Sequence, residues 1–274
     1  MPVPMPDARD RAAPPTVSIV LPTYQRAALL GRSIDSVLAQ SWDDFELIVV
    51  DDGSTDETGA VLASRGDPRL RVLRQDVNRG AAAARNAGIG AAAGRFLAFQ
   101  DSDDEWLPEK LARHMAAFAA RGPEIGVVYS DMQRIHSDGG EEYHRSPTIV
   151  GDRLLNPETR FYQVCQLGIQ ATVIRRECFA ATGLFNEAFP ALEDLELFIR
   201  LSRRTRFHHL PEALVRYHET DGLSKDTRSK VVARTLLLEL YGRELMDSDP
   251  GFVDRERAAI DAARQRLQPV ESRP

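Results

Sequence analysis

The sequence predicts an α/β fold in which a mainly parallel β-sheet is flanked by helices on both faces. Short apolar runs rich in β-branched residues alternate with segments whose apolar residues recur at helical spacing, and four such runs fall between residues 17 and 99. Polar clusters directly follow three of these runs. Because parallel strands are joined through crossover helices, this alternation indicates right-handed βαβ units.

The elements of the first half follow from this alternation. Pro22 ends the first β-branched run, and the next segment carries apolar residues three and four positions apart. Ser54 and Glu57 have the spacing of a capping box for the second helix, and Pro108 suits the first turn of the fourth. The predicted strands cover residues 17–21, 45–50, 70–74 and 95–99, and the predicted helices cover residues 28–40, 56–65, 80–93 and 108–120.

The second half lacks regular alternation, which predicts a mixed α+β arrangement. Residues 131–165 are polar and are predicted to be rich in loops. The predicted strands cover residues 125–130, 169–175, 206–210 and 213–218, and the predicted helices cover residues 193–204, 226–247 and 252–268.

One globular domain in two halves is therefore expected. Residues 16–107 form the first half and residues 108–224 the second, and the C-terminal helices occupy residues 225–274. Residues 1–15 contain five prolines and are expected to be a disordered lead-in, not a signal peptide, because they have no apolar core. Cys165 and Cys178 are expected to be reduced, packed thiols.

Composition and charge restrict the classes of function. The 274 residues are 43% hydrophobic and 28% charged, which is typical of a soluble enzyme or binding protein. The formal charge of −6 provides no general basic field for nucleic acid, so a phosphate-bearing ligand needs local groups or a metal ion. No run approaches the roughly 18 apolar residues of a membrane span, so we expect a cytoplasmic protein that could dock on the inner face of a membrane.

The polar clusters lie at predicted carboxyl ends of strands, where open α/β sheets bind ligands. The turn Asp101-Ser102-Asp103-Asp104 could place carboxylates around Mg²⁺ or Mn²⁺, or it could be a solvated turn that caps the next helix. Asp52 could likewise accept hydrogen bonds from a base or sugar, or start a turn.

Four further residues are candidates with structural alternatives. Tyr24 offers a ring face for a base but could simply pack at an edge, and Arg85 could reach a diphosphate or lie on an exposed helix edge. Asp194 could take a proton or favour a helix N-terminus, and His218 could bind a metal or be structural. The glycines near residue 90 lie within a predicted helix, which argues against a dehydrogenase dinucleotide fingerprint, and there is no GxxxxGK[ST] phosphate loop.

Six blocks in order resemble the inverting family 2 glycosyltransferases, which have a GT-A type (Rossmann-like) fold. They are VSIVLPTYQR, FELIVVDDGSTDET, NRGAAAARNAG, FLAFQDSDDEW, GLFNEAF with LEDLELFIRL, and VRYHETDGLS, and they extend from residue 17 to residue 224. The resemblance implies a nucleotide-sugar (donor) half, a metal- and acceptor-side half, and a divalent metal cofactor, Mn²⁺ or Mg²⁺.

The resemblance also implies a role for each candidate. Pro22, Tyr24 and Asp52 would hold the base, with Arg85 near the uracil or diphosphate and Asp101 near the ribose. Asp103 would bind the metal, Asp104 would share one of these tasks, and His218 would reach the metal or diphosphate. Asp194 would be the general base. Glu196 departs from the aspartate of many relatives.

The predicted function is metal-dependent transfer of a sugar from a UDP-sugar to a hydroxyl of a glycan, lipid-linked or small-molecule acceptor, in envelope polysaccharide or glycolipid synthesis. An inactive nucleotide-sugar-binding protein is the first alternative. A sugar nucleotidyltransferase is the second alternative. Such enzymes have a glycine-rich loop after the first strand, whereas residues 22–26 contain no glycine.

Overall fold

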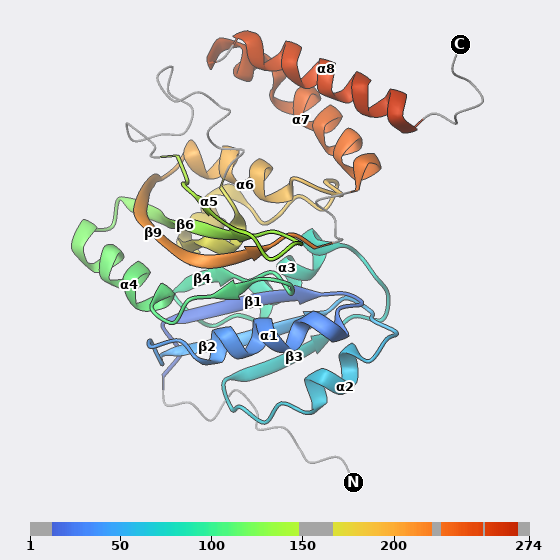
Figure 1. Cartoon of the computed structure of the whole chain (residues 1–274). Helices are drawn as coiled ribbons and strands as arrows, with labels where there is room; N and C mark the ends of the chain where they lie inside the picture. The colour runs from blue at the N-terminus through green and yellow to red at the C-terminus, as the bar shows by residue number, and fades with distance from the viewer. Residues whose placement is uncertain (1–12, 148–166, 221–225, 249, 268–274) are drawn as a thin grey trace.

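The computed structural model describes residues 13–147, 167–220, 226–248 and 250–267. Within them, one nine-stranded sheet runs through the molecule in the order β3-β2-β1-β4-β8-β6-β9-β5, and β7 pairs with β6 (Figure 1). The predicted α/β class is therefore confirmed.

The first half is a parallel sheet with helices on both faces. Its four parallel strands are β1 (Val17–Thr23), β2 (Phe45–Asp51), β3 (Leu70–Arg74) and β4 (Phe96–Phe99). The helices are α1 (Ala27–Leu38), α2 (Thr58–Ala63) and α3 (Ala81–Ala91).

Alternate residues of β1 face opposite sides of the sheet. Ile19 packs with Leu30 and Ile34 of α1, whereas Val20 packs with Ala84 and Ile89 of α3. Both faces are buried, which explains why this strand is a continuous apolar run instead of an alternating one.

The second half continues the same sheet with mixed strand directions. The strands are β5 (Glu105–Trp106), β6 (Ile125–Ile135), β7 (Glu141–His144), β8 (Thr172–Arg175) and β9 (Arg206–His218). β8 runs antiparallel to both β4 and β6, and β9 runs parallel to β6. The helices of this half are α4 (Lys110–Arg121), η3 (Ile169–Ala171), α5 (Arg176–Thr182) and α6 (Glu193–Ser202).

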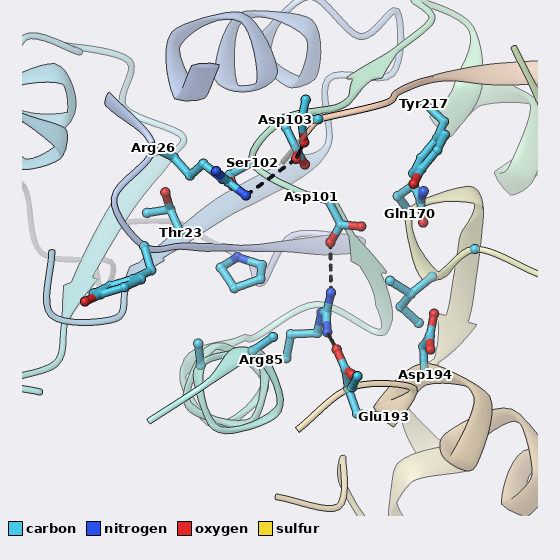
Figure 2. Close-up of a pocket in the computed structure, with 18 of the residues that line it drawn as sticks. Thr23, Arg26, Arg85, Asp101, Ser102, Asp103, Gln170, Glu193, Asp194 and Tyr217 are labelled. Carbon is cyan, nitrogen blue, oxygen red and sulfur yellow. Dashed lines mark hydrogen bonds and ion pairs between the residues drawn. The ribbon is translucent and has the colours of Figure 1, made fainter. Parts of the chain in front are cut away.

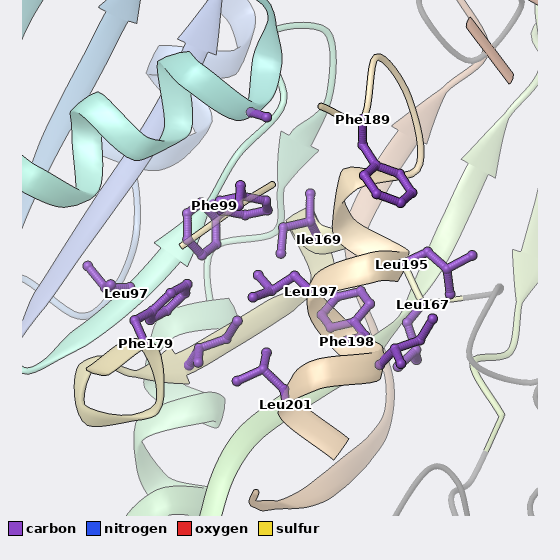
Figure 3. Packing of buried hydrophobic residues seen from close by; sticks show 14 of the residues in the cluster. Leu97, Phe99, Leu167, Ile169, Phe179, Phe189, Leu195, Leu197, Phe198 and Leu201 are labelled. Carbon is purple, nitrogen blue, oxygen red and sulfur yellow. The ribbon is translucent and has the colours of Figure 1, made fainter. Parts of the chain in front are cut away.

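Buried side chains join α6 to the centre of the sheet. Leu97 and Phe99 of β4 belong to the same core cluster as Leu197, Phe198 and Leu201 of α6 (Figure 3). This packing holds the first turn of α6 beside the carboxyl ends of the parallel strands.

The C-terminal helices α7 (Thr227–Ser248) and α8 (Pro250–Leu267) form a hairpin. It lies on the side of α6 that faces away from the parallel strands (Figure 1). Tyr241 and Leu237 of α7 pack against the core cluster that contains α6. Across the described residues, every helix is too short or too polar to span a bilayer.

Several sequence predictions of secondary structure were wrong in detail. β6 continues to Ile135 and pairs with β7, so residues 131–147 contain a hairpin where loops were predicted. Residues 206–218 form one strand instead of two, because β-bulges absorb the interruption around Pro211. The sequence analysis also missed the short β5 and α5.

The capping box at α2 does not form. The N-cap residue is Glu57, with no side-chain cap, because the Ser54 hydroxyl accepts the Gln25 N–H at 3.0 Å. Cys178 is a buried free thiol, as predicted, whereas Cys165, most of the predicted lead-in and the loop predicted over 148–165 lie outside the described residues.

The contact of α3 with β1 generates a stability prediction. A Cβ at Gly88 would lie 2.4 Å from Cγ1 of Val20, whereas a Cβ at Gly90 would meet nothing within 4 Å. We expect Gly88→Ala to reduce the free energy of unfolding by about 1–3 kcal/mol, and Gly90→Ala to leave it unchanged or raise it by up to about 1 kcal/mol. Urea denaturation measures both, and equal stability of the two variants would contradict this packing.

Candidate active site

A pocket of about 770 Å³ opens at the carboxyl ends of the parallel strands. Residues from both halves and from α7 line it. The structure brings eight of the nine predicted site residues to its walls, namely Pro22, Tyr24, Asp52, Arg85, Asp101, Asp103, Asp194 and His218. Asp104 is the exception.

The wall formed by β1 and β2 combines a ring with a fixed carboxylate. Tyr24 is 43% exposed, so its ring is accessible from the pocket. Asp52 is buried, and its two oxygens accept the backbone N–H groups of Arg79 at 2.9 Å and Gly80 at 2.8 Å. Asp52 therefore holds the loop that leads into α3, while each oxygen retains a second lone pair.

Side chains of α1 bind the backbone of the acidic turn that follows β4. The Ser33 hydroxyl donates to the carbonyl oxygen of Asp101 at 2.8 Å, and Arg32 donates to the carbonyl oxygen of Asp103 at 2.7 Å. Because the backbone is fixed in this way, the Asp101 and Asp103 side chains are directed into the pocket (Figure 2).

Asp103 has two neighbours that the sequence analysis missed. Its carboxylate accepts a short hydrogen bond from the Thr220 hydroxyl, and the Arg26 guanidinium lies 3.9 Å away. Both neighbours line the same pocket (Figure 2 shows Arg26). Thr220 follows β9, so only the sheet topology brings it next to a turn more than a hundred residues earlier in the chain.

Asp104 and His218 each have a partner within the protein. Asp104 is 1% exposed and accepts the backbone N–H of His218 at 2.9 Å. Burial, together with the charges of Asp101 and Asp103, raises the pKa of Asp104 well above its usual range. The His218 ring lies 2.7 Å from Glu105, so it is directed at a carboxylate that the sequence analysis did not include.

Arg85 forms the centre of a buried ion cluster. Its guanidinium donates to Asp101 at 2.8 Å and makes a shorter hydrogen bond to Glu193, the first residue of α6 (Figure 2). The Phe185 ring lies 5.4 Å below the guanidinium. The side chain is not on an exposed helix edge, and its two carboxylates raise its pKa despite burial.

Asp194 stands beside this cluster at the start of α6. Leu192, which precedes the helix, has a φ of 60°, a conformation that is uncommon for residues other than glycine and often marks functional sites. Burial and the adjacent Glu193 charge raise the pKa of Asp194 to about 7, although Arg85 opposes the shift. A carboxylate with a pKa near neutrality can accept a proton from a substrate hydroxyl at physiological pH.

The carboxylates in the pocket could bind a divalent cation whose remaining ligands come from water and from a substrate. In the described part of the chain, no three Asp, Glu, His or Cys side chains form a complete metal site. Mg²⁺ and Mn²⁺ usually take only one or two protein carboxylates and complete their shell with water and phosphate oxygens. Asp101 and Asp103, which both line the pocket, supply this number.

Comparison with known families identifies the chain. The family model for glycosyl transferase family 2 matches residues 18–178. The chain belongs to this family. The match includes most of β1, the acidic turn and β8, and most of the residues that line the pocket fall within it.

Curated relatives of this family 2 glycosyltransferase act in bacterial polysaccharide and glycolipid synthesis, according to their names. The chain is 32% identical to the succinoglycan biosynthesis protein ExoO of Rhizobium meliloti, over 93% of this chain and 72% of that protein. It is 36% identical to the UDP-Glc:alpha-D-GlcNAc-diphosphoundecaprenol beta-1,3-glucosyltransferase WfgD of Escherichia coli, over 68% of each chain. It spans only 40% of an uncharacterized glycosyltransferase of Rickettsia felis.

Solved structures show the same GT-A fold. Staphylococcus aureus TarS in complex with UDP matches with a TM-score of 0.66 and 18% identity, over 93% of this chain and 76% of that chain. A mannosyltransferase from Pyrobaculum calidifontis in complex with GDP-Man and Mn²⁺ matches with a TM-score of 0.63 and 16% identity, over 98% of this chain and 80% of that chain. The predicted GT-A fold of this family 2 glycosyltransferase is confirmed.

The ion cluster generates a second prediction. Arg85→Met leaves Asp101 and Glu193 without their shared buried partner, so we expect the free energy of unfolding to fall by about 3–5 kcal/mol. Arg79 is matched in chemistry but 58% exposed in its pair with Glu187. Arg79→Met should therefore cost at most about 1 kcal/mol. Urea denaturation compares the two, and equal losses would show that the Arg85 cluster adds nothing beyond a surface ion pair.

Proposed function

We propose that this family 2 glycosyltransferase transfers a sugar from a UDP-sugar to a hydroxyl of a saccharide acceptor, with inversion, during polysaccharide or glycolipid synthesis in the cytoplasm. The observation that carries the proposal is the raised pKa of Asp194 in the same pocket as the acidic turn. The UDP-sugar named for WfgD and the UDP bound to TarS favour a UDP-linked donor here.

The donor base would lie between Tyr24 and Asp52. The exposed ring of Tyr24 and the adjacent Pro22 offer apolar surfaces for stacking. Asp52 is fixed by two backbone N–H groups, so its remaining lone pairs can accept the N–H of a uracil ring without reorganisation. Asp101 would accept a ribose hydroxyl, and Arg85 would position Asp101 instead of binding the diphosphate directly.

Asp103, assisted by Asp101, would hold Mn²⁺ or Mg²⁺ against the donor diphosphate. When bound, the cation neutralises charge that develops on the departing diphosphate. Asp104 and His218 are left out of this ligand set because they are engaged with each other and with Glu105. Arg26, 3.9 Å from Asp103, can also approach a diphosphate at this position.

Asp194 would accept the proton of the acceptor hydroxyl while that oxygen attacks the anomeric carbon. The backbone N–H of Leu195 binds one carboxylate oxygen at 2.8 Å and leaves the other for the acceptor. Attack on the face opposite the diphosphate inverts the anomeric configuration. The acceptor would be a glycan, a lipid-linked saccharide or a small molecule, and a lipid-linked acceptor would bring the protein to the membrane surface.

The base assignment is tested by Asp194→Asn. This variant should bind UDP with parental affinity but lose about 10²- to 10⁴-fold in turnover. Because only the carboxylate form accepts a proton and the pKa of Asp194 is raised to about 7, parental activity should fall as pH decreases below 7 and level off above it. A flat profile between pH 5 and 8, or full activity of the variant, would contradict the assignment.

The metal assignment is tested by Asp103→Asn. Isothermal titration should show that this variant loses most of the Mn²⁺-dependent gain in UDP affinity, because one of two carboxylate ligands becomes a weaker amide ligand. Asp43→Asn, at a carboxylate that is 91% exposed, is the matched control and should retain the gain. Parental Mn²⁺ dependence in Asp103→Asn would exclude this carboxylate, and UDP-sugar binding without transfer to any acceptor would favour an inactive binding protein.

A further inference from the structure

The walls of the pocket differ in charge. Among the described residues, every carboxylate that lines it directly follows β2, belongs to the acidic turn or lies at the start of α6. The opposite wall, built from β6, β7, the end of β9 and α7, contributes basic side chains and no carboxylate from the described residues. These basic residues are Arg134, His144, His218 and Lys230.

Lys230 is the only lysine that lines the pocket among the described residues. It belongs to the first turn of α7 and is partly buried at the pocket wall. Among the described residues, no carboxylate lies within ion-pair distance of its ammonium group, whereas Arg26, Arg85 and Arg134, which line the same pocket, each have one. A protein of net charge −6 that turns an unpaired lysine toward its active-site pocket offers a local site for an anion.

The position of Lys230 is fixed relative to the proposed base. Tyr241 of α7 donates to Glu196 of α6 at 2.5 Å, and Arg200 binds the same carboxylate at 2.7 Å. α6 begins at Glu193 and carries Asp194 in its first turn. The Glu196 carboxylate therefore connects α7, which carries Lys230, to α6, which carries Asp194.

Arg134 extends this basic surface on the sheet. Its ion pairs with Glu142 and Glu219 are both long, at 3.9 Å, and neither carboxylate lines the pocket. Such exposed, distant pairs contribute little, so the guanidinium can take a better acceptor. His144 lies opposite Met132 on the neighbouring strand, next to this position.

The donor diphosphate does not account for these cations. The acidic turn leads directly into β5, which pairs with β9, and β9 lies between β5 and β6. Two strand spacings, about 10 Å, therefore separate the backbone of Arg134 from the strand that follows Asp103. In the proposed function, Asp103, Asp101 and Arg26 account for the donor diphosphate at the opposite wall of the pocket.

We propose that Lys230 and Arg134, with His144, form an acceptor subsite that binds a phosphate group, so that the acceptor is a saccharide linked to phosphate. This inference rests on the proposed function, because the acceptor hydroxyl must reach Asp194 while the phosphate lies on the opposite wall. The phosphate is either that of a soluble sugar phosphate or that of a lipid-linked saccharide.

The test uses full-length protein saturated with UDP and Mg²⁺, which blocks the donor site. Isothermal titration with glucose 1-phosphate and with methyl glucoside compares a charged with a neutral probe. We expect the parental protein to bind the charged probe more tightly, and Lys230→Gln to weaken that binding about tenfold while UDP affinity stays within about twofold. Arg228→Gln, at an exposed arginine of the same helix, is the matched control and should change neither affinity.

Two results would overturn the inference while leaving the proposed function intact. One is equal binding of the two probes by a protein that binds UDP. The other is parental binding of glucose 1-phosphate by both Lys230→Gln and Arg134→Gln. If Lys230→Gln instead weakens UDP binding by the same factor, the cation serves the donor and the acceptor subsite is also rejected. Failure of the parental protein to bind UDP would count against the proposed donor site itself.

A third arm separates the two sources of phosphate. The same sugar phosphate esterified to a farnesyl chain is presented in neutral phosphatidylcholine vesicles, and binding is measured by co-sedimentation. Either source supports the anion subsite, provided that Lys230→Gln reduces binding, and tighter binding of the vesicle-borne ester identifies a lipid-linked acceptor. Loss of binding as salt rises is expected for both forms, because exposed charge interactions are screened.

Discussion

The active site depends on one buried arginine. Arg85 lies on α3 and binds a carboxylate from the acidic turn and another from the first residue of α6, so it joins three elements that are distant in sequence. Without its charge, Asp101 and Glu193 would repel each other in a buried environment. Burial raises the pKa of Asp194, and the same cluster acts on it too, because the Glu193 charge raises that pKa further while Arg85 opposes the shift. The ions that hold these elements together are therefore also charges that surround Asp194.

The sheet explains why these groups meet at one edge. The parallel strands β1, β2 and β4 end together and place Tyr24, Asp52 and the acidic turn on one wall. The reversal at β8 then brings β6 and β9 alongside, and α7 closes the far wall through its contact with α6. A donor on the first wall and an acceptor on the second would meet at Asp194. Such a division of tasks would account for the difference in charge between the walls.

The regular first half could be predicted from sequence because its signals are local. Buried parallel strands are continuous apolar runs, and the polar residues that follow them, such as Tyr24, Asp52 and Asp103, line the pocket. The second half depends on contacts between residues far apart in sequence, which no local pattern reveals. β9 is one strand because it pairs with β6 on both sides of its bulges. Thr220 and Lys230 line the pocket only because the fold brings them next to the first half. The partners of Arg85 and the burial of Asp104 were missed for the same reason, although the Glu193-Asp194 pair itself was visible as a motif.

The central claim is that the acidic turn and the wall formed by β1 and β2 together bind a nucleotide diphosphate with a divalent cation. A crystal structure with UDP and Mn²⁺, read with anomalous scattering, tests this most directly. The account predicts a manganese peak in contact with Asp103 and the diphosphate, with the uracil beside Tyr24 and Asp52. A nucleotide bound elsewhere, or a manganese peak away from the acidic turn, would contradict it.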